Sequence, residues 1–350
     1  MLLTLLLACS EDCVPAPEGS LGDPTAWELE YLSAGQTIEL PQYSDLTAED
    51  GFALAHADWV PDGWDGTGSI VILAHGSSAH GALYAVLGSG LADRGVYARL
   101  LDIRGHGMSR CPDPADCDAT QLPSYIDDGD YWPGRPGDAL DEHQPVRDLL
   151  LQVTDLQERF PAASIVLAGH SSGGGLVSRA VELSGAPGAA GVALIAPFNH
   201  PDQPQVELGS WECGTIVGTA YAQVDLGALG DARRGNPHRY VISLNKPAEY
   251  QDALDTTQYT YTLNQGLAVT NPDTFHAAFT MPTLWVAGQK DAMLDLAKSE
   301  DEFGKMPGGV AFVEVEDTSH VGVTWSDGVA GILADFALDP EQVTSGIITP

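Results

Sequence analysis

The sequence predicts an α/β protein with a mostly parallel central sheet, flanked by helices and interrupted by an inserted cap. Two observations support this prediction. Short apolar runs alternate with helical patterns over residues 31–198 and again over 280–340, which is the order expected of right-handed βαβ units. Residues 199–279 show neither kind of regularity. We therefore expect a sheet domain built from two segments, with residues 199–279 as a cap between them.

The individual elements follow from local patterns. Continuous apolar runs are typical of strands covered on both faces, and an apolar repeat at helical spacing followed by Gly or Pro marks a helix end. Strands are expected at residues 37–40 and 52–60, as an antiparallel pair, and at 69–74, 96–103, 164–168, 191–196, 283–287 and 310–315. Helices are expected at residues 79–94, 141–160, from 174 onward, 291–303 and 327–337, followed by a frayed tail at 341–350.

The composition excludes one class of partner. The chain of 350 residues has 15 Lys and Arg against 49 Asp and Glu, a formal net charge of −34. A field of that sign repels nucleic acid, so nucleic-acid binding is excluded. Because no single run of like charge is long, the acidic residues are interpreted as a solvated surface.

The first residues predict export. Residues 1–9 form an apolar segment that is too short to span a bilayer and is interpreted as a signal. Its end, Leu6-Leu-Ala-Cys9, resembles the bacterial lipoprotein signal, in which the cysteine is lipidated. Residues 10–30 would then be a tether, and the protein a cell-envelope lipoprotein anchored through Cys9. An ordinary secretory signal without lipidation is the alternative.

The other cysteines predict a disulfide. Cys13, Cys111, Cys117 and Cys213 form an even set, which in an oxidising compartment allows three pairings. Cys111 and Cys117 bracket a short Pro-containing loop and are the preferred pair. Their spacing, without nearby histidines, does not favour zinc.

The segment Gly169-His-Ser-Ser-Gly173 follows an apolar run and precedes a helical segment. This is the strand-turn-helix context of a nucleophile elbow. Ser171 at its centre needs a positive φ on a tight turn, so the residues two before and two after must be small. Ser171 is therefore the candidate nucleophile.

Two backbone N–H groups are candidates for an oxyanion hole. Ser77 lies in the loop after the strand at 69–74, and Ser172 directly follows the candidate nucleophile. Their N–H groups can stabilise one tetrahedral oxygen together. We assign no catalytic role to His75 or His80, which are interpreted as structural residues.

The general base is expected in the last part of the chain. His320 is the only histidine after residue 279 and lies just beyond the strand at 310–315. Asp291 follows the strand at 283–287 and is the candidate acid that orients His320. Asp295, one turn further on, and Asp202, after the preceding strand, are alternatives for the acid.

These motifs, with His75-Gly76, the segment 102–109 and Gly288-Gln-Lys-Asp291, resemble the lysophospholipase and monoacylglycerol-lipase-like branch of the α/β-hydrolases. The resemblance covers about 50–198 and 280–338 and implies the α/β-hydrolase fold. It implies structural roles for Arg104 and His106. An aspartate nucleophile, as in related dehalogenases, would occupy the elbow, so Asp102 is not interpreted as one. The cap and a long acidic loop at 111–143 are departures from the branch.

The chemistry implied is hydrolysis of a small-molecule carboxylic ester through an acyl-enzyme, outside the cytoplasm. It needs no metal or organic cofactor. A serine peptidase or amidase of the same fold is the alternative, because acidic residues of the loop could hold a substrate amine. These are Asp127, Asp128, Asp130, Asp138, Asp141 and Glu142. A catalytically silent, membrane-tethered binding protein is a further hypothesis.

Overall fold

The computed structural model describes residues 24–34, 38, 41–110, 139–206, 211–213, 216–218, 222–244 and 254–350. Nine of the described strands form one large sheet in the order β1-β2-β4-β3-β5-β6-β12-β13-β14. They are β1 (Tyr43–Thr47), β2 (Ala53–Trp59), β3 (Thr67–Ala74), β4 (Tyr97–Leu101), β5 (Ala162–His170), β6 (Ala189–Ile195), β12 (Thr283–Gly288), β13 (Val310–Val315) and β14 (Gly346–Ile348).

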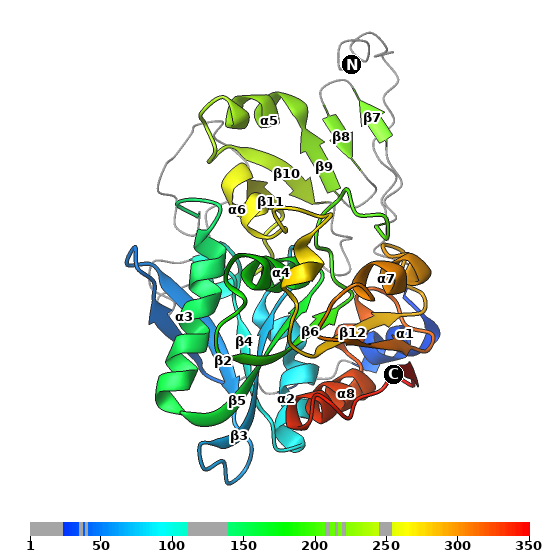
Figure 1. Ribbon diagram of the computed structural model, residues 1–350. Coiled ribbons are helices and arrows are strands. Elements are labelled where there is room, and N and C mark those ends of the chain that lie inside the picture. Colours follow the sequence, from blue (N-terminus) through cyan, green and yellow to red (C-terminus); the bar gives the residue numbers. More distant parts are fainter. Residues whose placement is uncertain are drawn as a thin grey trace.

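The sheet is parallel from β4 to β14, and only β1 and β2 run antiparallel to their neighbours. This confirms the predicted fold class. Helix α2 packs beside α8, and α3 beside α4 (Figure 1). The bounds of the helices in this domain are α1 (Ala26–Ala34), α2 (Ala85–Asp93), α3 (Gln144–Arg159), α4 (Ser172–Ser184), α7 (Leu296–Phe303) and α8 (Asp327–Leu338).

The central strands are apolar on both faces because helices cover them. Every residue of β4 and β12 is buried, as is the second half of β3 and of β5. Such strands cannot alternate between polar and apolar residues, which explains why they appear in the sequence as continuous apolar runs. The loops at their carboxyl ends therefore project from a rigid layer.

The region between β6 and β12 forms a second, smaller sheet. Its antiparallel strands, in the order β11-β10-β9-β8-β7, lie above the large sheet in Figure 1. The elements are β7 (Trp211–Cys213), β8 (Ile216–Gly218), β9 (Ala222–Asp225), α5 (Leu226–Arg233), β10 (Tyr240–Leu244), β11 (Gln258–Thr260) and α6 (Tyr261–Gly266). The sequence showed no periodicity in this region because strands of three to five residues are too short to show one.

Both ends of the described chain differ from the sequence-based expectation. Residues 26–34 form helix α1 rather than the end of a tether. The tail is not frayed along its whole length, because β14 pairs in parallel with β13 and extends the sheet. The antiparallel partner of β2 is β1, at Tyr43–Thr47, rather than a strand at residues 37–40. Helix α1 and strand β14 pack against distant segments of the chain, so neither is marked by a local sequence pattern.

Several predictions fall outside the described residues. These are the signal at residues 1–9, most of the tether, Cys9, Cys13, Cys111 and Cys117, the side chain of Cys213, and Asp127, Asp128, Asp130 and Asp138 of the acidic loop. The lipid anchor and the disulfide therefore stay predictions. Among the helices that the structure describes, none has the length and apolarity needed to cross a membrane.

Arg99, on β4, is fully buried and is held by carboxylates. Its guanidinium donates to both oxygens of Asp58, at 2.8 and 2.9 Å, and to Asp155 at 2.7 Å. Burial alone would raise the pKa of Asp58, but the hydrogen bonds and charge of Arg99 lower it. The group is therefore an ion-pair network around a buried guanidinium, at one edge of the parallel strands.

Replacing Arg99 by methionine is expected to lower the free energy of unfolding by about 3 kcal/mol, because the partly buried Asp58 and Asp155 then keep only the half-exposed Arg159 as a counter-charge. Urea unfolding measures this loss. Arg94→Met is the matched control, since Arg94 pairs with the exposed Asp327 at 2.8 Å and such surface pairs contribute about 1 kcal/mol or less. Equal effects of the two substitutions would contradict the network interpretation.

Candidate active site

Ser171 lies on a tight turn between β5 and α4, with φ 52° and ψ −122°. Only small residues fit around it. A Cβ on Gly169 would lie 2.3 Å from the carbonyl oxygen of Gly173, and a Cβ on Gly173 would lie 2.3 Å from that of Ala74. The turn therefore has the strained geometry of a nucleophile elbow, with Ser171 8% exposed at its apex.

His320 lies after β13, and its Nδ1 is 2.8 Å from Oδ2 of Asp291. Both side chains are buried, at 2% and 0% exposure. Because a carboxylate only accepts hydrogen bonds, Nδ1 carries the proton and Nε2 is the acceptor. Nε2 is buried and has no hydrogen-bond partner among the described residues. This is the arrangement of a general base oriented by an acid.

The two alternative acids lie elsewhere. Asp295 caps the start of α7 by accepting from the Lys298 N–H at 3.0 Å, and it also pairs with the Lys298 ammonium. These hydrogen bonds lower the pKa of Asp295. The side chain of Asp202 is 83% exposed and lies 3.8 Å from His200. Of the three candidates, the structure brings only Asp291 to His320.

His170 joins the elbow to the loop of the base. It directly precedes Ser171, and its Nε2 donates to the carbonyl oxygen of His320 at 2.9 Å. The two imidazole rings lie 5.0 Å apart between centroids. The loop that carries His320 is therefore fixed against the residue next to the candidate nucleophile.

The two predicted oxyanion residues also meet. The hydroxyl of Ser77 donates to that of Ser172 at 2.9 Å. The preceding Gly76 lies so close to the elbow that an added Cβ would be 3.0 Å from Cβ of Ser171. The turn after β3 and the start of α4 therefore approach Ser171 from two sides, and α4 directs the positive end of its dipole to the same place.

A tyrosine of the sheet domain holds the first N–H of the oxyanion turn. The Gly76 N–H donates to the Tyr84 hydroxyl at 2.7 Å, and that hydroxyl donates to Nδ1 of His170 at 2.7 Å. Burial, together with the charge of His320, lowers the pKa of His170 to about 3. A neutral His170 can accept at Nδ1 and donate at Nε2, so one chain of hydrogen bonds links the oxyanion turn, the elbow and the base loop.

A tyrosine of the small sheet holds the N–H of Ser78, on the other side of Ser77. The Ser78 N–H donates to the hydroxyl of Tyr259, on β11, at 2.7 Å, and the Tyr259 hydroxyl lies 2.6 Å from Nε2 of His106. Nδ1 of His106 donates to the carbonyl oxygen of Arg104 at 3.1 Å. The small sheet is thereby bonded to the oxyanion turn. Neither tyrosine was predicted from the sequence. No motif marks Tyr84, and nothing in the sequence distinguishes Tyr259 from the other tyrosines of residues 199–279.

His75 and His80 are buried beside this turn. Nε2 of His75 accepts from the Ile103 N–H at 3.0 Å, and Nδ1 donates to the carbonyl oxygen of Gly76 at 2.8 Å. Burial, with the neighbouring His106, keeps the pKa of His75 well below its usual value. A ring whose two nitrogens are both occupied by the backbone suits a structural role.

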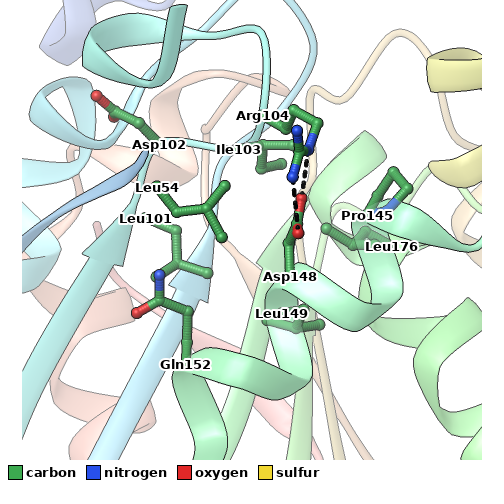
Figure 2. A pocket seen from close by; sticks show the side chains of 10 residues that line it. All are labelled: Leu54, Leu101, Asp102, Ile103, Arg104, Pro145, Asp148, Leu149, Gln152 and Leu176. Atoms are coloured by element: carbon green, nitrogen blue, oxygen red, sulfur yellow. Dashed lines mark hydrogen bonds and ion pairs between the residues drawn. The ribbon is translucent and has the colours of Figure 1, made fainter. Parts of the chain in front are cut away.

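The loop after β4 is held by Asp102 and Arg104. Asp102 accepts from the Gly81 N–H at 2.6 Å and the Met108 N–H at 2.7 Å. Arg104 makes ion pairs with Asp148, at 2.7 Å, and with Asp50. Figure 2 shows the Arg104–Asp148 pair at a pocket between this loop and α3. Ser171, Asp291 and His320 are not among the residues that line this pocket, so we do not assign it to the substrate.

Replacement of Tyr84 by phenylalanine is expected to lower kcat about tenfold with little change in KM. The substitution leaves the Gly76 N–H and Nδ1 of His170 without their partner, at a cost of about 1–3 kcal/mol, and loosens the oxyanion turn. Steady-state kinetics measures the separate effects on kcat and KM. Tyr261→Phe, which removes a hydroxyl from α6 of the cap, is the matched control. Equal losses of kcat in the two variants would contradict the proposed chain of hydrogen bonds.

A family model described as "Serine aminopeptidase, S33" matches residues 67–320. The chain belongs to this family. The S33 match begins at β3 and ends on His320, so it includes the elbow and the base. No curated protein matches the sequence.

Solved structures show the same fold for this S33 member at low identity. A soluble variant of monoglyceride lipase from Saccharomyces cerevisiae, in complex with a substrate analog, is 15% identical with a TM-score of 0.62, covering 88% of this chain and 98% of its own. Monoacylglycerol lipase of Paleococcus ferrophilus is 17% identical, TM-score 0.53, covering 82% and 99%. Est1E of Butyrivibrio proteoclasticus, with ferulic acid bound, is 17% identical, TM-score 0.52, covering 85% and 96%. The α/β-hydrolase fold that the resemblance implied is thereby confirmed.

Proposed function

We propose that this serine hydrolase cleaves a carboxylic ester through an acyl-enzyme on Ser171. The observation that carries the proposal is the state of His320. Its Nδ1 is occupied by Asp291 at 2.8 Å, and its buried Nε2 has no partner among the described residues. A base in this state, fixed against the residue before Ser171, is ready to take a proton from a nearby hydroxyl.

The geometry supports the following sequence of events. The Ser171 hydroxyl attacks the ester carbonyl while its proton passes to Nε2 of His320, and Asp291 stabilises the resulting imidazolium. The N–H groups of Ser77 and Ser172 stabilise the negative oxygen of the tetrahedral intermediate. His320 then protonates the leaving alcohol, and the same base activates water to release the acid. Apart from the ester and water, every group in these steps belongs to this chain.

Two observations favour an ester over an aminoacyl substrate. Of the acidic residues considered for binding an amine, the structure describes Asp141 and Glu142. Asp141 pairs with Arg147 at 2.9 Å, and Glu142 lies 3.8 Å from Arg179. Carboxylates already opposed by guanidinium groups attract an amine weakly. The monoglyceride lipase structures with the same fold support the same preference.

The deciding experiment is labelling of the folded protein, without its first nine residues, by a fluorophosphonate. Hydrolysis of p-nitrophenyl acetate, butyrate and octanoate and of an aminoacyl p-nitroanilide is assayed alongside. Labelling at Ser171 with ester turnover is the expected result, and the acyl series then ranks chain length. Labelling at Ser171 with cleavage of the anilide but not of the esters would identify the protein as a peptidase rather than an esterase. The absence of labelling would favour a silent binding protein.

We also propose that the protein is exported and anchored through Cys9. The apolar segment before Cys9 supports this. Expression of the full chain in a Gram-negative host with labelled palmitate should give a lipidated envelope protein, and Cys9→Ser should abolish the label. A protein that is exported but unlabelled would point to the ordinary secretory signal.

A further inference from the structure

Helix α1 packs against the loop that carries His320. Three side chains of the helix contact the loop at residues 317–325, nearly 300 positions away in the sequence. The indole N–H of Trp27 donates to the carbonyl oxygen of Asp317 at 2.9 Å, and the ring of Tyr31 stacks on Trp325 with centroids 5.4 Å apart. Between them, Glu28 makes the central contact. The helix, in blue in Figure 1, therefore covers the base loop.

Glu28 is a fully buried carboxylate. Its Oε1 accepts from the Ser319 N–H at 2.8 Å, and its Oε2 accepts from the Thr25 N–H at 2.7 Å. Burying a carboxylate is costly unless its oxygens are hydrogen-bonded. A buried carboxylate in a helix interface is therefore explained by what it binds, the N–H of Ser319, the residue directly before His320.

The loop is shaped to receive this carboxylate. A Cβ on Gly322 would lie 1.6 Å from Oε1 of Glu28, so the glycine leaves the space that the carboxylate fills. Asp317, at the start of the loop, has φ 45°, which is unusual for a residue with a side chain. A strained loop of this kind persists only where its surroundings hold it.

We propose that Glu28 is a positioning residue for the general base, and that α1 is part of the catalytic assembly. The inference rests on the proposed function. By fixing the Ser319 N–H, Glu28 sets the backbone from which His320 projects, while Asp291 fixes the imidazole from the other side. Residues 24–34 lie before the part of the chain that the S33 family model matches, residues 67–320.

The test compares kcat, KM and fluorophosphonate labelling rate for variants of the full chain. Glu28→Ala is expected to lower kcat and the labelling rate about 10- to 100-fold, since a small displacement of a catalytic group has effects of that size. KM should change little. Glu28→Gln keeps a carbonyl oxygen for the Ser319 N–H and should lose less than about tenfold. Glu30→Ala, an exposed position on the same helix, is the matched control.

A spectroscopic measurement separates positioning from general loss of structure. The Nδ1–H proton of His320, in its hydrogen bond with Asp291, is expected as a downfield NMR signal in the unmodified protein. Glu28→Ala should shift or broaden this signal, whereas Glu30→Ala should leave it unchanged. If Glu28→Ala does not fold, the decision passes to Glu28→Met and Trp27→Phe. These variants keep an unbranched side chain and an aromatic ring but lose the hydrogen bonds to the Ser319 N–H and the Asp317 carbonyl oxygen. Wild-type kcat in both of these variants would overturn the proposal.

A double-mutant cycle tests the fit directly. Gly322→Ala should lower kcat strongly in the unmodified chain, because the new methyl group collides with the carboxylate, and should cost much less when Glu28 is alanine. Additive losses would overturn the proposal. Failure of the unmodified protein to label at all would instead overturn the proposed function. Labelling of Glu28→Ala at the wild-type rate would overturn the role of Glu28 and leave the proposed function intact.

Discussion

Ser171→Ala is expected to lower the rate of ester hydrolysis about 10⁴- to 10⁶-fold, because the acyl-enzyme can no longer form. The residual rate would come from the oxyanion donors and from substrate binding. The fold should be unaffected, since an alanine at this position is smaller than the serine and meets the same steric limits. Initial rates with p-nitrophenyl esters measure the effect, and thermal unfolding checks the fold.

The matched control is Ser178→Ala. Ser178 is a buried serine of α4, the helix that follows Ser171, and its hydroxyl donates to Asn199 at 3.2 Å. Its replacement should change stability without removing activity or labelling. Near-normal turnover by the Ser171 variant would show that the nucleophile has been assigned wrongly.

Asp291→Asn is expected to lower kcat about 10⁴-fold. An asparagine can present its N–H₂ group to Nδ1 of His320, which favours the tautomer with the proton on Nε2, and an imidazole in that state cannot accept the proton of Ser171. The amide also provides no charge to stabilise the imidazolium. The rate should recover partly at high pH, where hydroxide takes over the role of the base, so a pH–rate profile is the measurement.

Asp202→Asn and Asp295→Asn are the controls for this assignment. Asp202 is exposed, and Asp295 caps α7, so both variants should keep kcat within about threefold of the original, with Asp295→Asn losing some stability as a weakened helix cap. A larger loss for Asp202→Asn than for Asp291→Asn would reverse the choice of acid.

Much of the fold and part of the site could be predicted from local sequence. The buried strands β3, β5 and β12 are visible because a strand covered on both faces is a continuous apolar run. The elbow around Ser171 is visible because a positive φ on a tight turn demands glycines at set positions. In each case the physical constraint acts between residues that are near neighbours in the chain.

The tertiary structure was needed to choose among the candidate acids and to identify which strands pair. Asp291, Asp295 and Asp202 were all compatible with the chain order, and the 2.8 Å contact with His320 separates Asp291 from the other two. Strand β14 was expected to be a frayed tail, because three residues show no period and their partner β13 lies some 30 positions earlier.

By itself the sequence determined the α/β fold class, the place of the nucleophile and the region of its base, since these follow from periodicity and the sterics of one turn. Only the tertiary structure decided what holds them in place. Tyr84 reaches the oxyanion turn from a short 3-10 helix and Tyr259 reaches it from the small sheet, while Glu28 reaches Ser319 across 291 positions. A hydrogen bond between distant segments depends on how whole elements pack, and no pattern of neighbouring residues encodes that.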